Sequence, residues 1–78
     1  MTYRIRRYGS HGFALRLDNG RSAYFGRRDG DYYRAGGELI WREAGLRKLE
    51  GLGLFKFDSG KCAPTIAALM AGGARVAA

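Results

Sequence analysis

The fold is decided between residues 13 and 26, which read Phe13-Ala-Leu-Arg-Leu-Asp-Asn-Gly-Arg-Ser-Ala-Tyr-Phe-Gly26. Two stretches that alternate apolar and polar residues flank the dipeptide Asn19-Gly20. Asn-Gly favours the two positive-φ positions of a type I′ turn, so the pattern predicts a β-hairpin of residues 13–18 with residues 21–26. A two-residue loop would pair Leu15 with Tyr24. It would place Tyr24 on the apolar face and Phe25 on the opposite face.

A further strand is predicted before this hairpin, over residues 3–8. A three-residue loop at residues 9–11 would pair Ile5 with Leu15, whereas a four-residue loop would set Ile5 on the charged face. Because a one-residue slip moves every side chain to the other face, the apolar pattern favours the three-residue loop. The two registers together predict four arginines on one face of a three-stranded meander, namely Arg4, Arg6, Arg16 and Arg21.

The second half of the chain has a less regular pattern. Residues 32–34 can begin a strand that Gly36-Gly37 would end. Residues 38–43 fit a strand but could also open a helix towards Leu49, and we favour the strand, followed by a helical turn near residues 46–49. Residues 52–57 are apolar and aromatic and predict a last strand. Residues 63–71 predict a C-terminal helix that Gly72-Gly73 ends, with an apolar side formed by Ile66, Leu69 and Met70.

These elements predict an α+β fold. It consists of a small antiparallel β-sheet, a meander of about four to five strands, with one C-terminal helix packed on a face. The length of 78 residues predicts a single domain over residues 1–78. Residues 74–78 are expected to be a frayed tail.

The net charge is +7, and eleven arginines but only three lysines carry the positive charge. Residues 1–37 hold eight Arg and three Asp, a net +5, and residues 38–78 hold six basic and four acidic side chains, a net +2. The arginine fork fits phosphates and carboxylates and stacks on rings, so the excess favours a binding surface in the first half. A coding sequence rich in G and C would also enrich Arg, Ala and Gly together.

Cysteine and hydropathy patterns bear on the cellular compartment. Cys62 is the only cysteine, so no internal disulfide is expected, which favours a reducing, cytoplasmic setting. The longest uncharged stretch, residues 62–74, is too short to span a bilayer, and the N-terminal residues do not resemble a signal peptide. We therefore expect a cytoplasmic protein with no membrane contact.

No residue pattern indicates catalysis, a metal site or a cofactor. His11 is the only histidine, and neither a cysteine nor a carboxylate lies near it in sequence. Cys62 would need that same histidine as its base. Residues 55–62 lack two of the fixed positions of a phosphate-binding P-loop, and residues 29–34 fail the later positions of a calcium loop. The chain is therefore predicted to be no enzyme.

The remaining candidate is the basic surface with interleaved aromatic residues. The predicted partner-binding residues are Arg4, Arg6, Arg16, Arg21, Arg27 and Arg28. Such a face suits the acidic surface of a protein partner, since Tyr, Trp and Arg dominate interface hot spots. It equally suits a nucleic-acid-binding module of low sequence specificity. A homodimer through an open sheet edge or the C-terminal helix is a third possibility.

As a whole-chain profile, a short basic domain without a common domain signature resembles the accessory proteins of phages and mobile elements. Among these it resembles the anti-CRISPR proteins, and its Arg/Ala/Gly-rich composition is similar to that expected of a type I-C inhibitor from a high-GC bacterium. Anti-CRISPR proteins share no motif, so no residue role carries over. The resemblance implies a phage inhibitor, in the host cytoplasm, that binds a subunit of a type I CRISPR surveillance complex and blocks target-DNA binding. Because this chain is basic, it cannot imitate DNA as acidic inhibitors do.

Overall fold

The computed structural model describes residues 2–60 and 62–72, which form two small sheets and two helices. The elements in chain order are β1 (Tyr3–Arg7), β2 (Gly12–Leu17), β3 (Ser22–Gly26), β4 (Tyr32–Ala35), β5 (Glu38–Trp41), α1 (Glu43–Gly51), a short 3-10 helix (Phe57–Ser59) and α2 (Ile66–Gly72). Strands β1, β2 and β3 form one antiparallel sheet, and β4 pairs with β5 in another. The α+β class is confirmed, but the strands divide into two sheets instead of one meander.

The register between β1 and β2 is the one that the apolar pattern predicts. Ile5 lies opposite Leu15, and Tyr3 lies opposite Leu17. The connecting loop is three residues long, and the His11 amide donates to the Tyr8 carbonyl oxygen at 3.1 Å. This pairing puts the apolar side chains of both strands on one face, where Tyr3, Leu15 and Leu17 are buried.

The predicted register between β2 and β3 is wrong by one residue. Leu15 lies opposite Ala23, not Tyr24, and the loop has three residues, 18–20. A type I′ turn needs a positive φ at Asn19, but the positive value falls on Gly20, at 91°, and no described non-glycine residue has one. The slip exchanges the two faces of β3. Phe25 is fully buried in the core, and Tyr24 is 38% exposed.

The β4–β5 hairpin has the two-residue turn that was predicted for the β2–β3 hairpin. Gly36 and Gly37 both have positive φ, 57° and 85°, and join β4 to β5 as a two-residue loop. Strand β5 ends at Trp41, two residues earlier than predicted, and α1 is a full helix instead of a single turn. Gly45 lies inside α1 because a Cβ there would come within 2.3 Å of the Asp31 carbonyl oxygen, so the helix packs closely on the backbone before β4.

The strand predicted over residues 52–57 is absent. The Leu54 amide donates to the Leu49 carbonyl oxygen at 3.0 Å, and Gly53 has a φ of 81°. This is the hydrogen-bonding pattern of a Schellman motif, which closes a helix with a left-handed glycine. The apolar residues after α1 therefore serve as its closing turn, and Leu52 is buried against the core without pairing in a sheet.

Helix α2 covers one end of the three-stranded sheet, as the apolar side of the predicted helix suggested. Ile66 and Leu69 are buried, and the Tyr3 hydroxyl donates to the Leu69 carbonyl oxygen. Burial raises the pKa of that hydroxyl. The helix begins at Ile66, later than predicted, with the Thr65 hydroxyl accepting the Ala68 amide. Gly73 and the predicted frayed tail, residues 74–78, lie outside the described residues.

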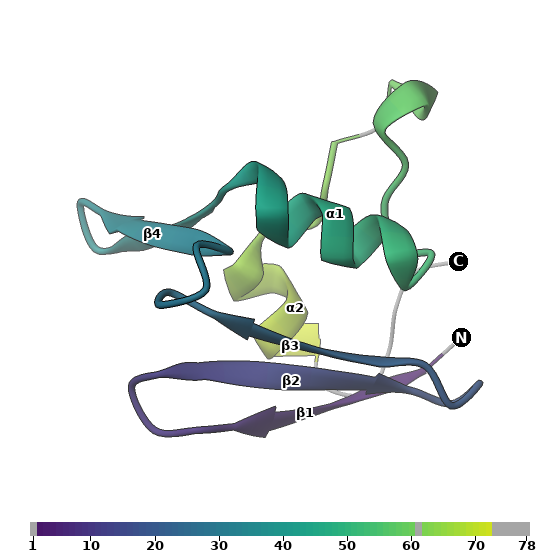
Figure 1. The fold of residues 1–78 in the computed structure, drawn as a ribbon, viewed down its shortest axis with the longest axis horizontal. Coiled ribbons are helices and arrows are strands. Elements are labelled where there is room, and N and C mark those ends of the chain that lie inside the picture. The colour runs from purple at the N-terminus through teal and green to yellow at the C-terminus, as the bar shows by residue number, and fades with distance from the viewer. Residues whose placement is uncertain (1, 61, 73–78) are drawn as a thin grey trace.

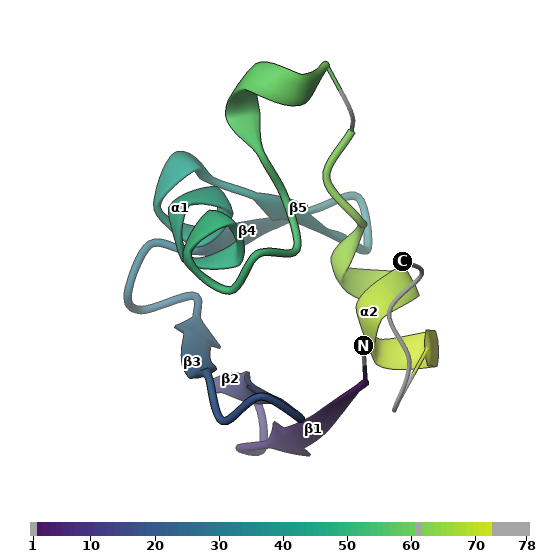
Figure 2. The ribbon, with the colours of Figure 1, turned by 90° about the vertical axis from the view of Figure 1, so that its right-hand side faces the viewer.

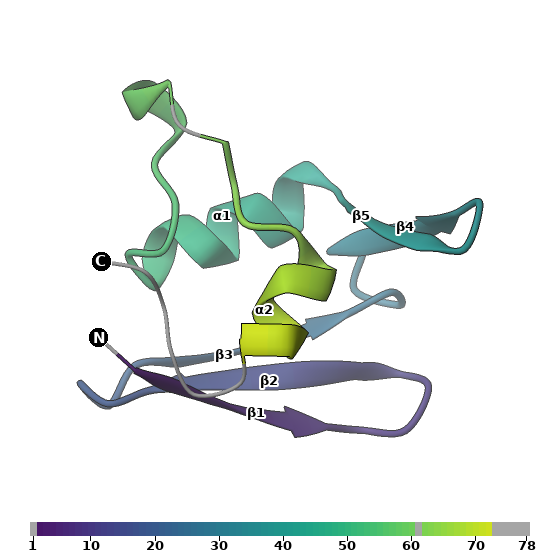
Figure 3. The same cartoon turned by 180° about the vertical axis from the view of Figure 1, so that it is seen from behind.

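Both α-helices and the β4–β5 hairpin lie on one side of the three-stranded sheet. Figures 1 and 3 show α1, α2 and the β4–β5 hairpin on the same side of β1, β2 and β3, and Figure 2 shows this arrangement from the end. The core fills the space between them and contains residues of every strand except β5, together with Leu49, Leu52, Ile66 and Leu69. The other face of the sheet, called the outer face below, has no described element over it.

A buried ion pair ties α1 to the turn between β3 and β4. Asp31 is fully buried, and its Oδ2 accepts the Lys48 ammonium at 2.8 Å and the Gly26 amide at 2.9 Å. The Lys48 ammonium also donates to the Tyr24 carbonyl oxygen at 2.7 Å. The second carboxylate oxygen of Asp31 has no hydrogen-bond partner among the described residues. This network fixes the position of α1 relative to the end of β3.

Candidate binding surface

The outer face is built by the alternate residues of three strands. The register sets Arg4, Arg16 and Ser22 in one row and Arg6, Ala14 and Tyr24 in the next, and Tyr8 follows Arg6 at the end of β1. All of these side chains except that of Ala14 are exposed. The face is therefore basic and aromatic, and its only aliphatic side chain is one alanine.

Two tyrosine rings lie side by side at one end of this face. Tyr8 and Tyr24 meet edge to face with 5.6 Å between ring centroids, and the Arg6 guanidinium lies 5.5 Å from the Tyr8 centroid. The rings are 41% and 38% exposed. Tyr24 lies close over Gly26, where a Cβ would approach its ring to 2.9 Å. Gly26 therefore allows the Tyr24 ring to lie along the sheet beside Tyr8.

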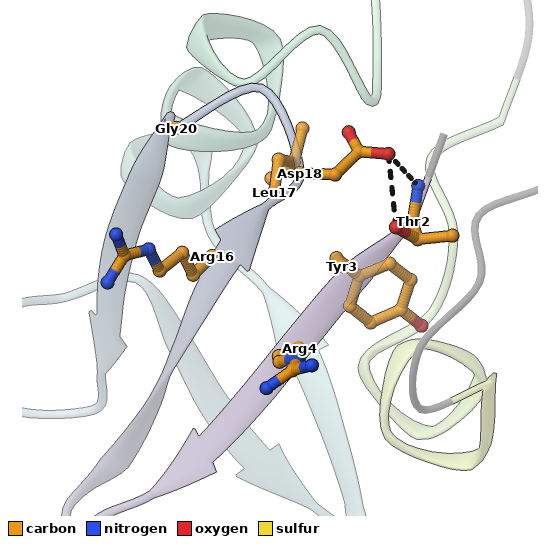
Figure 4. Close-up of a pocket in the computed structure, with 7 residues that line it drawn as sticks. All are labelled: Thr2, Tyr3, Arg4, Arg16, Leu17, Asp18 and Gly20. Carbon is orange, nitrogen blue, oxygen red and sulfur yellow. Dashed lines mark hydrogen bonds between the residues drawn. The ribbon is translucent and has the colours of Figure 1, made fainter.

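Two arginines line a hollow at the other end of the face. Arg4 and Arg16 lie directly opposite each other on β1 and β2 and border a hollow of about 490 Å³ (Figure 4). The Asp18 carboxylate closes one edge, accepting the Thr2 amide at 3.1 Å and the Thr2 hydroxyl at 3.0 Å. These hydrogen bonds lower the pKa of Asp18. The carboxylate is thus engaged by Thr2 and forms no ion pair with either arginine.

The arginines of the outer face have no acidic partner within the part of the chain that the structure describes. All described ion pairs involve Arg47 or Lys48, both on α1. Like charges directly opposite on neighbouring strands destabilise a sheet. Arg4 and Arg16 therefore form an arrangement that stability alone does not explain, and an anion between them would relieve it.

The six predicted binding residues do not stay together. Arg4, Arg6 and Arg16 share the outer face as predicted, and Arg28 borders a hollow beside Tyr8 and Tyr24. The structure separates the other two from this group. Arg21 was predicted to share the face, but the slipped register turns it towards α1, where its guanidinium donates to the Gly51 carbonyl oxygen at 2.9 Å. Arg27 borders a different hollow, between the two sheets.

Tyr24 is exposed on the outer face, although the sequence pattern predicted it in the core. The type I′ interpretation of Asn19-Gly20 placed it in the core, and the same error moved Phe25 to the outside. The signal that could have corrected it is Gly20, since a three-residue hairpin loop often ends in a left-handed glycine. With that loop, the alternation places Phe25 inward and Tyr24 outward.

Other kinds of site receive no support within the described residues. No group of three or more His, Cys, Asp or Glu residues in residues 2–60 and 62–72 is placed to hold a metal ion. Cys62 is exposed and forms no disulfide. None of the helices in those ranges is long and apolar enough to cross a membrane.

Comparisons with protein-family models, with curated proteins and with solved structures find no match to this chain. The anti-CRISPR resemblance therefore stays a prediction, and the function has to be argued from the geometry of the outer face.

Proposed function

We propose that this chain is a non-enzymatic binding protein whose outer face holds single-stranded nucleic acid with low sequence specificity. The observation that carries the proposal is that exposed tyrosine rings share one sheet face with arginines that have no carboxylate partner among residues 2–60 and 62–72. Arginine forks bind phosphate oxygens, and exposed rings stack on unpaired bases. Both kinds of contact are independent of base identity.

The arrangement of side chains on the outer face suits single-stranded nucleic acid. Arg4 and Arg16 at one end would contact phosphates, and Tyr8 and Tyr24 at the other end would stack on bases, with Arg6 between them. The sheet holds these side chains in fixed register, so ordering them on binding costs little entropy compared with a flexible basic tail.

The near absence of aliphatic side chains from the outer face favours nucleic acid over a protein partner. The centre of a protein interface is depleted of charged residues and rich in apolar area. Arginines occupy three positions in the two rows of the outer face, and Ala14 is the only aliphatic residue there. A polyanion compensates such a surface better than the mixed surface of a folded protein.

A second candidate function uses the same outer face to bind a protein instead of nucleic acid. Tyrosine and arginine are the side chains that dominate protein hot spots, and the face contains both. An acidic surface on a protein, such as the subunit of a type I CRISPR surveillance complex that the anti-CRISPR resemblance implies, could bind there. The chain would then act as an inhibitor of target-DNA binding.

The experiment is a fluorescence anisotropy titration of mixed-sequence single-stranded and duplex oligonucleotides with matched charge reversals. Arg4→Glu combined with Arg16→Glu should weaken single-strand binding at least about tenfold, since it removes two phosphate contacts and adds two repulsions. The control, Arg42→Glu with Lys56→Glu, changes the net charge equally through exposed side chains away from the outer face and should have a much smaller effect.

Two outcomes would overturn the proposal. Equal losses in the two double variants would mean that net charge alone drives the binding. No binding of any oligonucleotide at low salt would exclude nucleic acid and favour the protein partner.

A further inference from the structure

A second group of arginines surrounds a small hollow between the two sheets, away from the outer face. Arg7 reaches it from β1, Arg27 from the turn after β3, and Arg34 from β4. Arg7 lies opposite Phe13, so it belongs to the inner side of the sheet and not to the side of Arg4 and Arg6. The three guanidinium groups thus come from three separate parts of the chain.

No described carboxylate neutralises this group, because none of the three arginines takes part in an ion pair within residues 2–60 and 62–72. Three positive charges around one hollow repel each other and raise the energy of the empty fold. An anion in the hollow would remove that repulsion.

Tyr32 supplies an independent observation. Its side chain is only 4% exposed, and its ring is fixed between Phe13 and Trp41, at centroid distances of 6.0 and 6.4 Å. It also lines the hollow, yet its hydroxyl has no hydrogen bond to any described residue. Among the described residues only Asp31 Oδ1 is a buried side-chain oxygen without a partner, so the Tyr32 hydroxyl oxygen keeps access to the solvent and can donate to a ligand there.

The protonation state of the Tyr32 hydroxyl favours hydrogen bonding to an anion. Burial raises the pKa of its hydroxyl, and the charges of Arg27 and Arg34 offset this only in part. The hydroxyl therefore stays protonated at neutral pH and can donate a hydrogen bond to an anion.

We infer that this hollow, bordered by Arg7, Arg27, Arg34 and the Tyr32 hydroxyl, is a binding site for a phosphate group carried by a ligand. Three guanidinium forks and a hydroxyl exceed what one carboxylate can accept, whereas a phosphate monoester offers three terminal oxygens and a charge near −2. The hollow, of about 180 Å³, has room for a group of five heavy atoms, since a water molecule occupies roughly 30 Å³ in the liquid. Leu39 and Met70 also line the hollow, beside Gly9, Ser10 and Gly12, and offer an apolar wall to the organic part of the ligand.

The test is isothermal titration calorimetry of the full chain with inorganic phosphate, with acetate, and with one oligonucleotide that ends in either a phosphate or a hydroxyl. Arg34→Gln should weaken phosphate binding about tenfold or more, because a hydrogen bond to a charged group is lost. Tyr32→Phe keeps the buried ring and should weaken binding severalfold. Arg42→Gln and Tyr33→Phe, exposed residues outside the lining, are the matched controls and should leave it unchanged.

The outcomes separate this site from the outer face. Phosphate binding that survives Arg4→Glu with Arg16→Glu would support the inference even if the nucleic-acid proposal failed. Tighter binding of the phosphate-ended than of the hydroxyl-ended oligonucleotide would identify a strand end as the source of the phosphate, and equal binding of the two oligonucleotides would identify a small phosphorylated molecule. Absent or non-saturable phosphate binding, equal weakening by the control variants, or acetate binding as tight as phosphate would overturn it.

Discussion

The outer face of the three-stranded sheet and the helix α1 use positive charge in opposite ways. On α1, Lys48 pairs with the buried Asp31 at 2.8 Å, and Arg47 lies within ion-pair distance of Glu43 and Glu50. On the outer face, Arg4 and Arg16 lie directly opposite each other without a carboxylate partner among the described residues. The charges of α1 are used within the fold, and those of the outer face remain available to a ligand.

Removing a charge should therefore have different effects in the two regions. Removing a paired charge should change the free energy of unfolding, whereas removing an unpaired one should change affinity with little loss of stability. The proposed function depends on this separation, because a basic face that the fold itself needed would give no argument for a partner.

The largest expected effect is on stability and comes from the buried pair. Lys48→Met leaves the Asp31 carboxylate buried without its cation, which costs about 3 kcal/mol of unfolding free energy. Arg47→Met, on the same helix, removes two exposed ion pairs and a contact with the Phe57 ring at 4.3 Å, and should change stability by about 1 kcal/mol or less. Urea denaturation followed by circular dichroism measures both variants. Similar midpoints for the two would contradict the role of the buried Lys48–Asp31 pair in holding α1 on the fold.

The next effect is on affinity and comes from the tyrosine pair. Tyr8→Ala should weaken single-strand binding by about 1–3 kcal/mol, the usual value of one stacked base, which is roughly 5- to 150-fold. Tyr33→Ala is a close control, because Tyr33 is 39% exposed and also has an arginine, Arg42, over its ring at 4.6 Å. Anisotropy titrations compare the two, and an equal loss would mean that Tyr8 has no special role.

The smallest effect is a pH dependence at the edge of the outer face. The Thr2 hydrogen bonds hold the pKa of Asp18 below its ordinary value. Because the folded-state pKa is the lower one, the contact contributes fully above the ordinary value, about 3.9, and is lost as the pH falls through the depressed value. The Thr2 amide resonance should report this in an NMR titration. A midpoint at or above the ordinary aspartate value would show that the contact does not form in solution.

Much of the first sheet could be predicted because one strand pattern admitted only one good register. Ile5 and Tyr3 can both face the core only with the three-residue loop, and the structure has that loop. The β2–β3 register was missed because Asn-Gly favours a type I′ turn only statistically. Here Asn19 keeps a negative φ and Gly20 alone takes the left-handed conformation. The two-residue turn is formed instead by Gly36 and Gly37, neither of which meets a steric penalty at positive φ.

The residues of the outer face could be predicted only as far as the strand registers could. Arg4, Arg6 and Arg16 depend on the correct β1–β2 pairing and were found, whereas Arg21 and Tyr24 depend on the β2–β3 pairing and were misplaced. The false strand after α1 has a different cause. An apolar stretch has the same pattern whether it pairs in a sheet or closes a helix, and only the left-handed Gly53 distinguishes the two.

The central claim is that the unpaired arginines of the outer face contact phosphates, and the salt dependence of single-strand binding tests it most directly. For single strands the slope of log affinity against log salt is about −0.7 per phosphate contact, so Arg4→Gln with Arg16→Gln should make the slope shallower by about 1.4. The matched control, Arg42→Gln with Arg47→Gln, removes the same charge away from the outer face and should leave the slope near that of the original chain. Equal slopes for the two double variants would contradict the claim.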